Sequence, residues 1–106
     1  MGDRVSIQLC RANAKSVVLF SHWGGMEFVD WAKQEIKVIQ SQIPSCGYSN
    51  PMSRQEPQTV MVELARRAAN RINELLIEGD LYFGFDEDDG DNSDNGHHII
   101  QLPNYI

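Results

Sequence analysis

Apolar and polar residues alternate near the start of the chain. In the stretch "RVSIQLC", residues 4–10, Val5, Ile7 and Leu9 fall on one side of an extended segment. A period of two predicts a strand with one buried face. The stretch "SVVLFSH", residues 16–22, is almost continuously apolar and predicts a more central strand. Because only a short polar segment separates the two, we expect them to form a hairpin.

Two amphipathic helices are predicted in the middle of the chain. The first extends from about Met26 to about Ser41 and the second from about Pro57 to about Glu78, with Gly79 as its C-terminal stop. Their apolar residues recur at three- and four-residue steps: Phe28, Ala32, Ile36, Ile39 and Ile43 in the first, and Met61, Leu64, Ala65, Ala68, Ile72, Leu75 and Leu76 in the second. Each helix therefore has one face to bury.

Two further strands are predicted after the helices. Residues 81–85 and 98–102 both alternate, and Asn95-Gly96 between them is a common hairpin turn. The predicted order is ββααββ, and the fold class is α+β: a two-layer sandwich of a mostly antiparallel sheet with two helices on one face. The alternative is that the two hairpins belong to different sheets or are exchanged between subunits.

The 106 residues predict a single α+β domain spanning 1–106. A core of this size is marginal, and the predicted hairpins have open edges. We therefore expect a homo-oligomer, most simply a homodimer.

Charge is concentrated in one segment. Residues 86–97 hold six acids: Asp86, Glu87, Asp88, Asp89, Asp91 and Asp94. Subtracting these six from the 15 acids leaves nine, against nine lysines and arginines, so the rest of the chain is neutral. This distribution argues against nucleic acid or an anionic membrane as a partner. We expect residues 86–97 to form a mobile, solvated acidic loop. Glu63 lies at helical spacing from Arg66 and Arg67, which predicts ion pairs on the second helix.

Several features favour a cytoplasmic location. No apolar run is long enough to span a membrane, and we expect no signal peptide. Cys10 and Cys46 form neither a disulfide framework nor a metal-ligand set, so we interpret them as free thiols in a reducing compartment.

The clearest candidate for a ligand site is the turn Ser21-His22-Trp23-Gly24-Gly25. A strand that ends in glycines and opens a helix presents backbone N–H groups and the positive end of a helix dipole, which suits an anion or small ligand. His22 offers a proton and Trp23 a stacking surface. The stretch matches no phosphate-loop or nucleophile-elbow pattern. The structural alternative is a sharp turn that needs glycine, with Trp23 capping the core.

A metal site has weaker support. Asp91, Ser93 and Asn95 occupy the first, third and fifth positions of a calcium-type loop, with Gly96 at the sixth. Position twelve is Leu102, where such a loop requires a bidentate glutamate. We therefore predict no metal and no cofactor, and keep calcium-dependent regulation as an alternative. A cluster of His22, His98 and a carboxylate is a further metal alternative.

The stretch "VVLFSHWGG", an amphipathic helix and then "TVMVELARRAANRI" resemble a group of small uncharacterised proteins from bacteriophages, prophages and some microbial genomes. These proteins share a strand that ends in a His-x-Gly-Gly turn, here His22, Gly24 and Gly25, followed by a helix pair and a terminal hairpin. The resemblance implies a microbial cytoplasmic setting and supplies no catalytic residues.

The leading hypothesis is a non-enzymatic binding or protein-interaction module with a ligand-facing turn at residues 21–25. The competing hypothesis is a phosphate-ester or nucleotide hydrolase that uses His22, with the backbone amides of Gly24 and Gly25 holding the anion. No Ser/His/Asp or Cys/His arrangement can be placed from the sequence, which favours the module.

Overall fold

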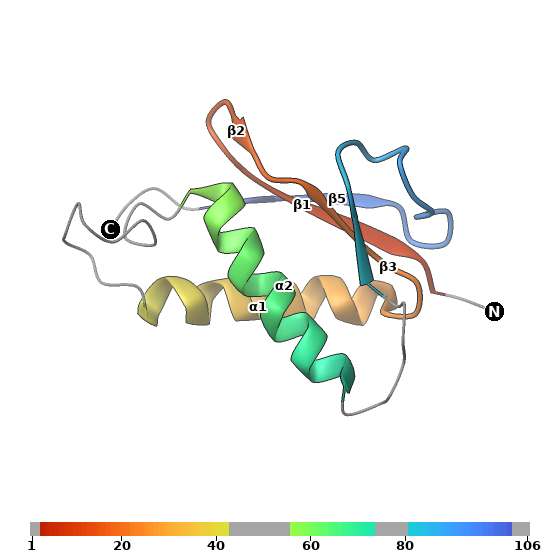
Figure 1. The fold of residues 1–106 in the computed structure, drawn as a ribbon, viewed down its shortest axis with the longest axis horizontal. Helices are drawn as coiled ribbons and strands as arrows, with labels where there is room; N and C mark the ends of the chain where they lie inside the picture. Colours follow the sequence, from red (N-terminus) through yellow and green to blue (C-terminus); the bar gives the residue numbers. More distant parts are fainter. Residues whose placement is uncertain (1–2, 43–55, 74–80, 103–106) are drawn as a thin grey trace.

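The structure is a computed structural model, and it describes residues 3–42, 56–73 and 81–102. The elements follow in the order β1 (Val5–Arg11), β2 (Ala14–Lys15), β3 (Val18–Ser21), α1 (Gly25–Gln42), α2 (Pro57–Asn73), β4 (Leu81–Gly84) and β5 (His97–Gln101). Figure 1 shows the strands as one curved layer and both helices below it.

The strands form one sheet in the order β5-β1-β3-β4, with the short β2 paired to the end of β1. β1 is antiparallel to β3, which confirms the predicted first hairpin, and β3 is antiparallel to β4. β5 runs parallel to β1, with Ser6 opposite His97. The predicted second hairpin is wrong, because β4 and β5 lie at opposite edges of the sheet. β4 stacks Tyr82 on Phe20 of β3, whereas β5 places Ile100 in the core beside β1.

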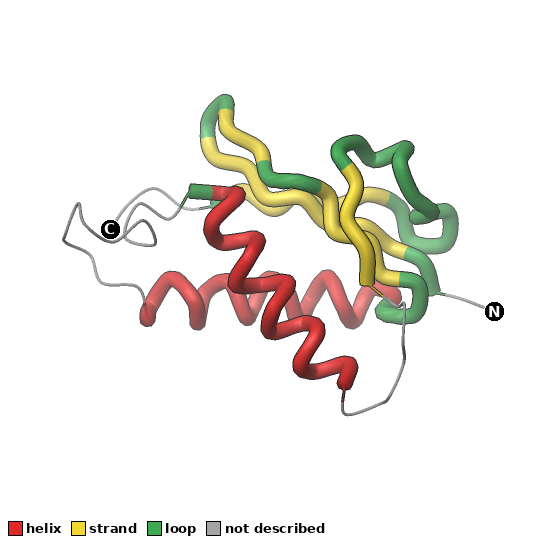
Figure 2. The backbone as a smooth tube through the Cα atoms, in the orientation of Figure 1, coloured by secondary structure: helices red, strands yellow, loops and turns green. Residues whose placement is uncertain are grey.

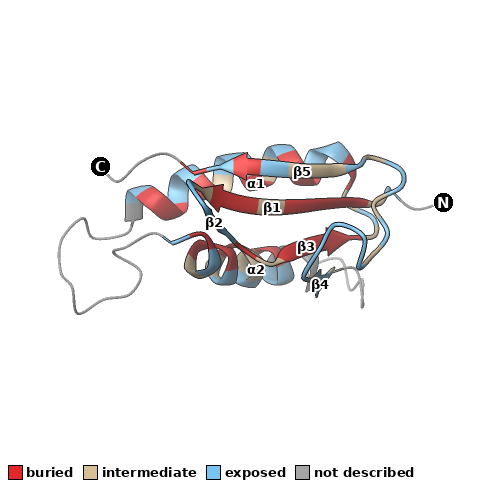
Figure 3. Ribbon diagram, turned by 90° about the horizontal axis from the view of Figure 1, so that it is seen from above, coloured by how far each residue is buried: buried red, intermediate tan, exposed pale blue. Residues whose placement is uncertain are grey.

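Both helices pack on the same face of the sheet, which confirms the α+β architecture (Figure 2). The core combines the alternating apolar residues of the first strand with the predicted helix stripes. Its members include Val5, Ile7, Leu9, Leu19, Phe28, Ala32, Ile36, Ile39, Met61, Leu64 and Ala68. The burial colours show β1 and β3 as the buried centre of the sheet and β4 as an exposed edge (Figure 3).

The helix boundaries agree closely with the sequence pattern. α1 begins one residue before the predicted Met26 and ends one residue after the predicted Ser41. α2 begins at the predicted Pro57 and is described as far as Asn73. The predicted stop at Gly79 lies outside the described residues, as does Cys46. Cys10 is a free, buried thiol.

An ion-pair cluster joins the two helices. Arg67 Nη1 lies 2.7 Å from Glu35 Oε1 on α1, and Arg67 Nε lies 2.9 Å from Glu63 Oε1 on its own helix. Arg66 also pairs with Glu63. The hydrogen bonds from Arg66 and Arg67 lower the pKa of Glu63 to about 2. The predicted ion pairs are confirmed, and the contact with Glu35 adds a link between the helices.

Residues 85–96, which we call the β4–β5 loop, lie over one part of the sheet face opposite the helices (Figure 1). Phe20 points to this face, since its neighbour Leu19 points to the core, and yet Phe20 is 0% exposed. Its ring stacks on Tyr82 with centroids 5.0 Å apart. Gly90 lies against both rings, and the Tyr82 hydroxyl accepts a hydrogen bond from the Asp91 amide at 2.9 Å. The loop thus shields Phe20 from water, while its mobility stays a prediction.

Candidate binding site

The predicted ligand turn is tied to the beginning of the chain. Asp3 donates its amide to the His22 carbonyl, and its own carbonyl accepts from the Gly25 amide, both at 2.9 Å. The Gly24 amide donates to Ser21 Oγ at 2.9 Å. Both glycine amides therefore have partners within the chain, and an anion at this turn would have to displace Ser21 Oγ and the Asp3 carbonyl.

The two glycines have steric reasons to be there. A Cβ atom on Gly24 would lie 2.5 Å from Phe28 Cβ and 2.6 Å from Ser21 Oγ, which is too close for any real contact. Gly25 has a φ of 61°, in the left-handed region that favours glycine. The structural interpretation of the glycines is therefore sufficient without a ligand.

Replacing Gly24 with alanine is expected to lower the free energy of unfolding by about 1–2 kcal/mol, because the added methyl group must push Phe28 or Ser21 aside. Urea denaturation of the purified variant measures this change. A variant as stable as the wild type would show that the turn has room for a side chain.

His22 and Trp23 lie at the surface of this turn. Their rings meet edge to face with centroids 4.3 Å apart. Trp23 is 47% exposed and His22 is half-buried, so Trp23 does not cap the core. The two side chains are accessible to a ligand, but the Gly24 and Gly25 amides beside them already donate hydrogen bonds within the chain. A small-ligand site at residues 21–25 stays a prediction.

The residues of the calcium-type pattern are engaged with one another and with Arg4. Asp91 Oδ1 accepts from the Ser93 amide at 3.0 Å, and Asp91 Oδ2 lies 3.2 Å from Arg4 Nε. Hydrogen bonds from Ser93, together with the charge of Arg4, lower the pKa of Asp91. Asn95 Nδ2 donates to the Arg4 carbonyl at 3.3 Å. Across residues 3–42, 56–73 and 81–102, no group of three or more His, Cys, Asp or Glu side chains is placed to hold a metal ion.

A chain of hydrogen bonds crosses the sheet beneath the β4–β5 loop. Ser6 Oγ lies 2.7 Å from His97 Nδ1, and His97 Nε2 lies 3.2 Å from Gln8 Oε1. Gln8 Nε2 donates to the Ser16 carbonyl, so Gln8 Oε1 must accept from His97 Nε2–H. In neutral His97 this leaves Nδ1 as the acceptor for the Ser6 hydroxyl. Asn92 Nδ2 completes the chain by donating to Ser6 Oγ at 2.9 Å.

Because these hydrogen bonds require a neutral His97, they predict that acid lowers the stability of the folded protein. Burial lowers the pKa of His97 below its usual 6.5, against the opposing charge of Glu87. Below pH 6.5 the unfolded chain therefore binds more protons at this position than the folded one, so the free energy of unfolding should fall as the pH falls through 6.5. Urea denaturation between pH 7.5 and 5.5 measures the slope, and His97→Gln should flatten it. An equal slope in the two proteins would contradict the prediction.

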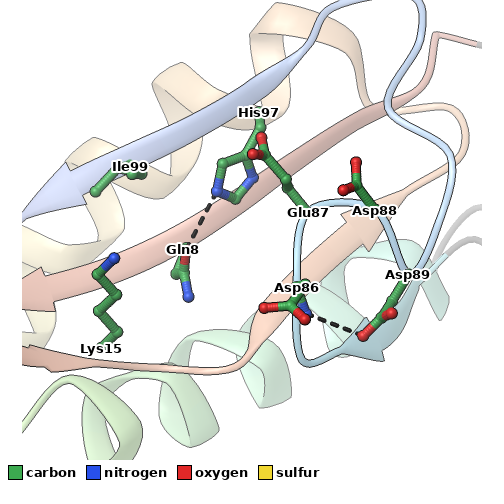
Figure 4. Close-up of a pocket in the computed structure, with 8 residues that line it drawn as sticks. All are labelled: Gln8, Lys15, Asp86, Glu87, Asp88, Asp89, His97 and Ile99. Carbon is green, nitrogen blue, oxygen red and sulfur yellow. Dashed lines mark hydrogen bonds between the residues drawn. The ribbon is translucent and has the colours of Figure 1, made fainter.

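A cavity of about 340 Å³ lies between the loop and the sheet (Figure 4). It is lined by Gln8, Lys15, Asp86, Glu87, Asp88, Asp89, His97 and Ile99. Asp89 has a structural role, because its Oδ2 accepts from the amides of Phe85 and Asp86 at 2.8 and 2.9 Å. Asp86, Glu87 and Asp88 are exposed, and none forms an ion pair with a basic side chain in the described part of the chain.

The strongest apolar exposure in the described structure is at β4. This strand pairs with β3, and no other described strand covers its outer side. Phe83 is 56% exposed, and Phe85, just beyond the strand, is 82% exposed. The alternation of these residues is visible in the sequence, but the predicted hairpin would have given β4 a second neighbour. The two phenylalanines were therefore missed as a binding surface.

A scan against models of protein families finds no match, and searches of curated proteins and of solved structures find none either. The resemblance to phage and prophage proteins stays a prediction. None of the helices described is long and apolar enough to cross a membrane.

Proposed function

We propose that this protein is a non-enzymatic interaction module that binds an extended segment of another polypeptide along β4. The observation that carries the proposal is the pair of exposed phenylalanines, Phe83 and Phe85, at a sheet edge that no other described strand covers. Phe83 lies on β4 and Phe85 directly beyond its end, so this edge offers two large exposed apolar side chains only two residues apart.

The backbone of β4 supplies the second part of the recognition of an added strand. An edge strand has outward N–H and C=O groups that can pair with an added strand. Such a strand gains main-chain hydrogen bonds along its length, and its alternate side chains contact those of β4 on one face. Half-buried Leu81 would extend the contact made by Phe83 and Phe85.

The contacts in the chain favour a binding role over catalysis. Ser6 and His97 form a serine–histidine pair, but Ser6 is 0% exposed and its hydroxyl is held by Asn92, so a substrate cannot reach it. The hydrolase hypothesis requires the Gly24 and Gly25 amides to hold an anion, and both donate within the chain. The two amides that this hypothesis assigns to the anion beside His22 are therefore already engaged.

Two parts of the proposal come from the sequence alone. The expected homodimer would place a second copy of the chain on the same edge, and we keep it as the alternative occupant. A microbial cytoplasm, in a phage or prophage context, remains the proposed setting, and the free buried Cys10 is compatible with a reducing compartment.

Selection from a library of random peptides tests the module. Peptides enriched on the wild-type protein should contain alternating apolar residues and should lose binding to Phe83→Ser/Phe85→Ser. The matched control is Val38→Ser/Val62→Ser, which removes two exposed apolar side chains from the helices and should bind as the wild type does. Enrichment that is equal on the wild type and the phenylalanine variant would refute the proposal. Sedimentation velocity on the same proteins tests the second copy as the occupant.

A further inference from the structure

We infer that His97 controls how the β4–β5 loop is held on the sheet: protonation of its ring releases residues 90–92 and uncovers Phe20. The inference is independent of the proposed function, because it uses neither of the exposed phenylalanines. It follows from the number of hydrogen-bond donors that meet at one buried hydroxyl group, that of Ser6.

Residues 90–92 of the loop contact the strands directly. A Cβ atom added to Gly90 would lie 2.6 Å from Tyr82 Cε2 and 2.7 Å from Phe20 Cδ1, so the loop backbone rests on both rings. The Asp91 amide donates to the Tyr82 hydroxyl at 2.9 Å. Phe20 is 0% exposed beneath these contacts, so it stays buried only while this part of the loop remains in place.

Asn92 attaches the same segment to β1. Its Nδ2 atom donates to Ser6 Oγ at 2.9 Å and to the Glu87 carbonyl at 3.1 Å. The Ser6 hydroxyl in turn donates its hydrogen to Nδ1 of neutral His97, 2.7 Å away. We call Ser6, His97 and Asn92 the latch. While the ring is neutral, the Ser6 hydroxyl hydrogen and both Nδ2 hydrogens of Asn92 have acceptors.

Protonation of His97 removes the acceptor at the centre of the latch. Nε2–H still donates to Gln8 Oε1, but Nδ1 becomes a second donor, directed at Ser6 Oγ. Ser6 Oγ then receives two donors, and its own hydrogen loses the acceptor it had. Because Ser6 is 0% exposed, water cannot replace that acceptor while the loop is closed, and an unsatisfied buried donor is costly.

Asn92 can relieve this conflict in two ways. Its amide can turn its oxygen toward the Ser6 hydroxyl, or the whole residue can move away from the sheet and admit water. Either movement breaks the hydrogen bonds that Asn92 Nδ2 makes to Ser6 and Glu87. Residues 90–92 are then held less firmly, and the cover over Phe20 opens.

The charges that face His97 leave this direction unchanged. The groups around the ring are Ser6 and Gln8 on β1, Lys15 on β2, His98 on β5, and Asp86, Glu87, Asp88 and Asp89 in the loop. Arg4, which precedes β1, is paired with two other loop carboxylates. Burial is the largest influence and lowers the pKa of His97 below its usual 6.5, although the charge of Glu87 raises it. An open loop returns the ring to water, so the open state binds the proton more tightly and acid favours opening.

Hydrogen exchange at the Asp91 amide, at about pH 7.5 and about pH 5.5, tests the latch. After correction for the intrinsic exchange rate, the fraction of time that this amide is open should rise by about three- to tenfold on acidification. Roughly tenfold is the upper limit, because an exposed histidine gains about that factor one pH unit below its pKa of 6.5. Asp91 should also exchange faster than Leu9 at both pH values, since the Leu9 amide donates to buried Ser16 Oγ.

The three histidines supply matched variants. His97→Gln should abolish the rise, whereas His22→Gln and His98→Gln remove the other two histidines and should preserve it. Asn92→Ala keeps the titrating ring but removes the loop side of the latch. In this variant Asp91 should already exchange rapidly at about pH 7.5, and acid should change its exchange by less than about twofold.

Nitrogen NMR of the His97 ring provides a second measurement on the wild-type protein. At about pH 7.5 the proton should be on Nε2 and Nδ1 should be bare. A proton on Nδ1 would overturn the inference. So would a rise that persists in His97→Gln, a full acid response in Asn92→Ala, or exchange at Asp91 that is no faster than at Leu9, because the loop would then open only when the whole protein unfolds. If His97→Gln does not fold, Asn92→Ala and the ring spectrum decide the question.

Discussion

Replacing Phe20 with alanine is expected to lower the free energy of unfolding by about 3–5 kcal/mol, the largest effect of any single change considered. Phe20 is completely buried, although it points away from the helices. It is enclosed by the Tyr82 ring, 5.0 Å away between centroids, and by Gly90 of the β4–β5 loop. Alanine would remove most of the apolar contact and leave a cavity that the loop backbone cannot fill without moving.

Urea denaturation followed by circular dichroism measures this loss, and Phe85→Ala is the matched control. The control makes the same change at a side chain that is 82% exposed, so the free energy of unfolding should stay within about 0.5 kcal/mol of the wild type. Hydrogen exchange at the Asp91 amide, which donates to the Tyr82 hydroxyl, should accelerate in Phe20→Ala. Equal stability of the two variants would show that the loop does not bury Phe20 in solution.

Ser6→Ala is expected to lower the free energy of unfolding by about 2–3 kcal/mol, which is large for the loss of one oxygen atom. The hydroxyl is the donor for His97 Nδ1 and the acceptor for Asn92 Nδ2. Alanine leaves His97 Nδ1 without that hydrogen bond in a partly buried site and removes one of the two hydrogen bonds donated by Asn92 Nδ2. An unsatisfied buried polar group costs about 1–3 kcal/mol, and two partners are affected here.

The control for this substitution is Ser41→Ala, near the end of α1. Ser41 is exposed and its hydroxyl donates only to the nearby Val38 carbonyl, so its loss should change the free energy of unfolding by less than about 0.5 kcal/mol. Thermal and urea denaturation at pH 7.5 compare the two variants. A Ser6 variant no less stable than the Ser41 variant would show that water replaces the serine hydroxyl at little cost.

Local patterns were enough to predict most of the fold. The alternation of Val5, Ile7 and Leu9 identified the core face of β1, and the apolar steps in α1 and α2 placed both helices to within a residue at the ends that can be compared. The pairing of β4 and β5 was not predictable in this way. Alternation identifies a strand and its buried face, but it does not say which neighbour the strand joins.

Long-range contacts explain what the sequence analysis missed at the site. The turn at residues 21–25 was located correctly, yet its hydrogen bonds to Asp3 join residues about twenty positions apart. The Ser6–His97 pair joins residues 91 positions apart through a parallel pairing that no local signal announces. Exposure of Phe83 and Phe85 likewise depends on which edge β4 occupies, and this is a property of the whole sheet.

The parallel pairing of β1 with β5 also has a consequence for how the chain folds. β1 lies inside the sheet, but one of its two sides is covered by residues 97–101, so that side stays open until those residues have been synthesised. Contacts between distant residues slow folding, because the chain must close a long loop before they form. On the ribosome, the hairpin of β1 and β3 should therefore emerge early with one open edge. β5 can join it only after residues 97–101 have left the ribosome.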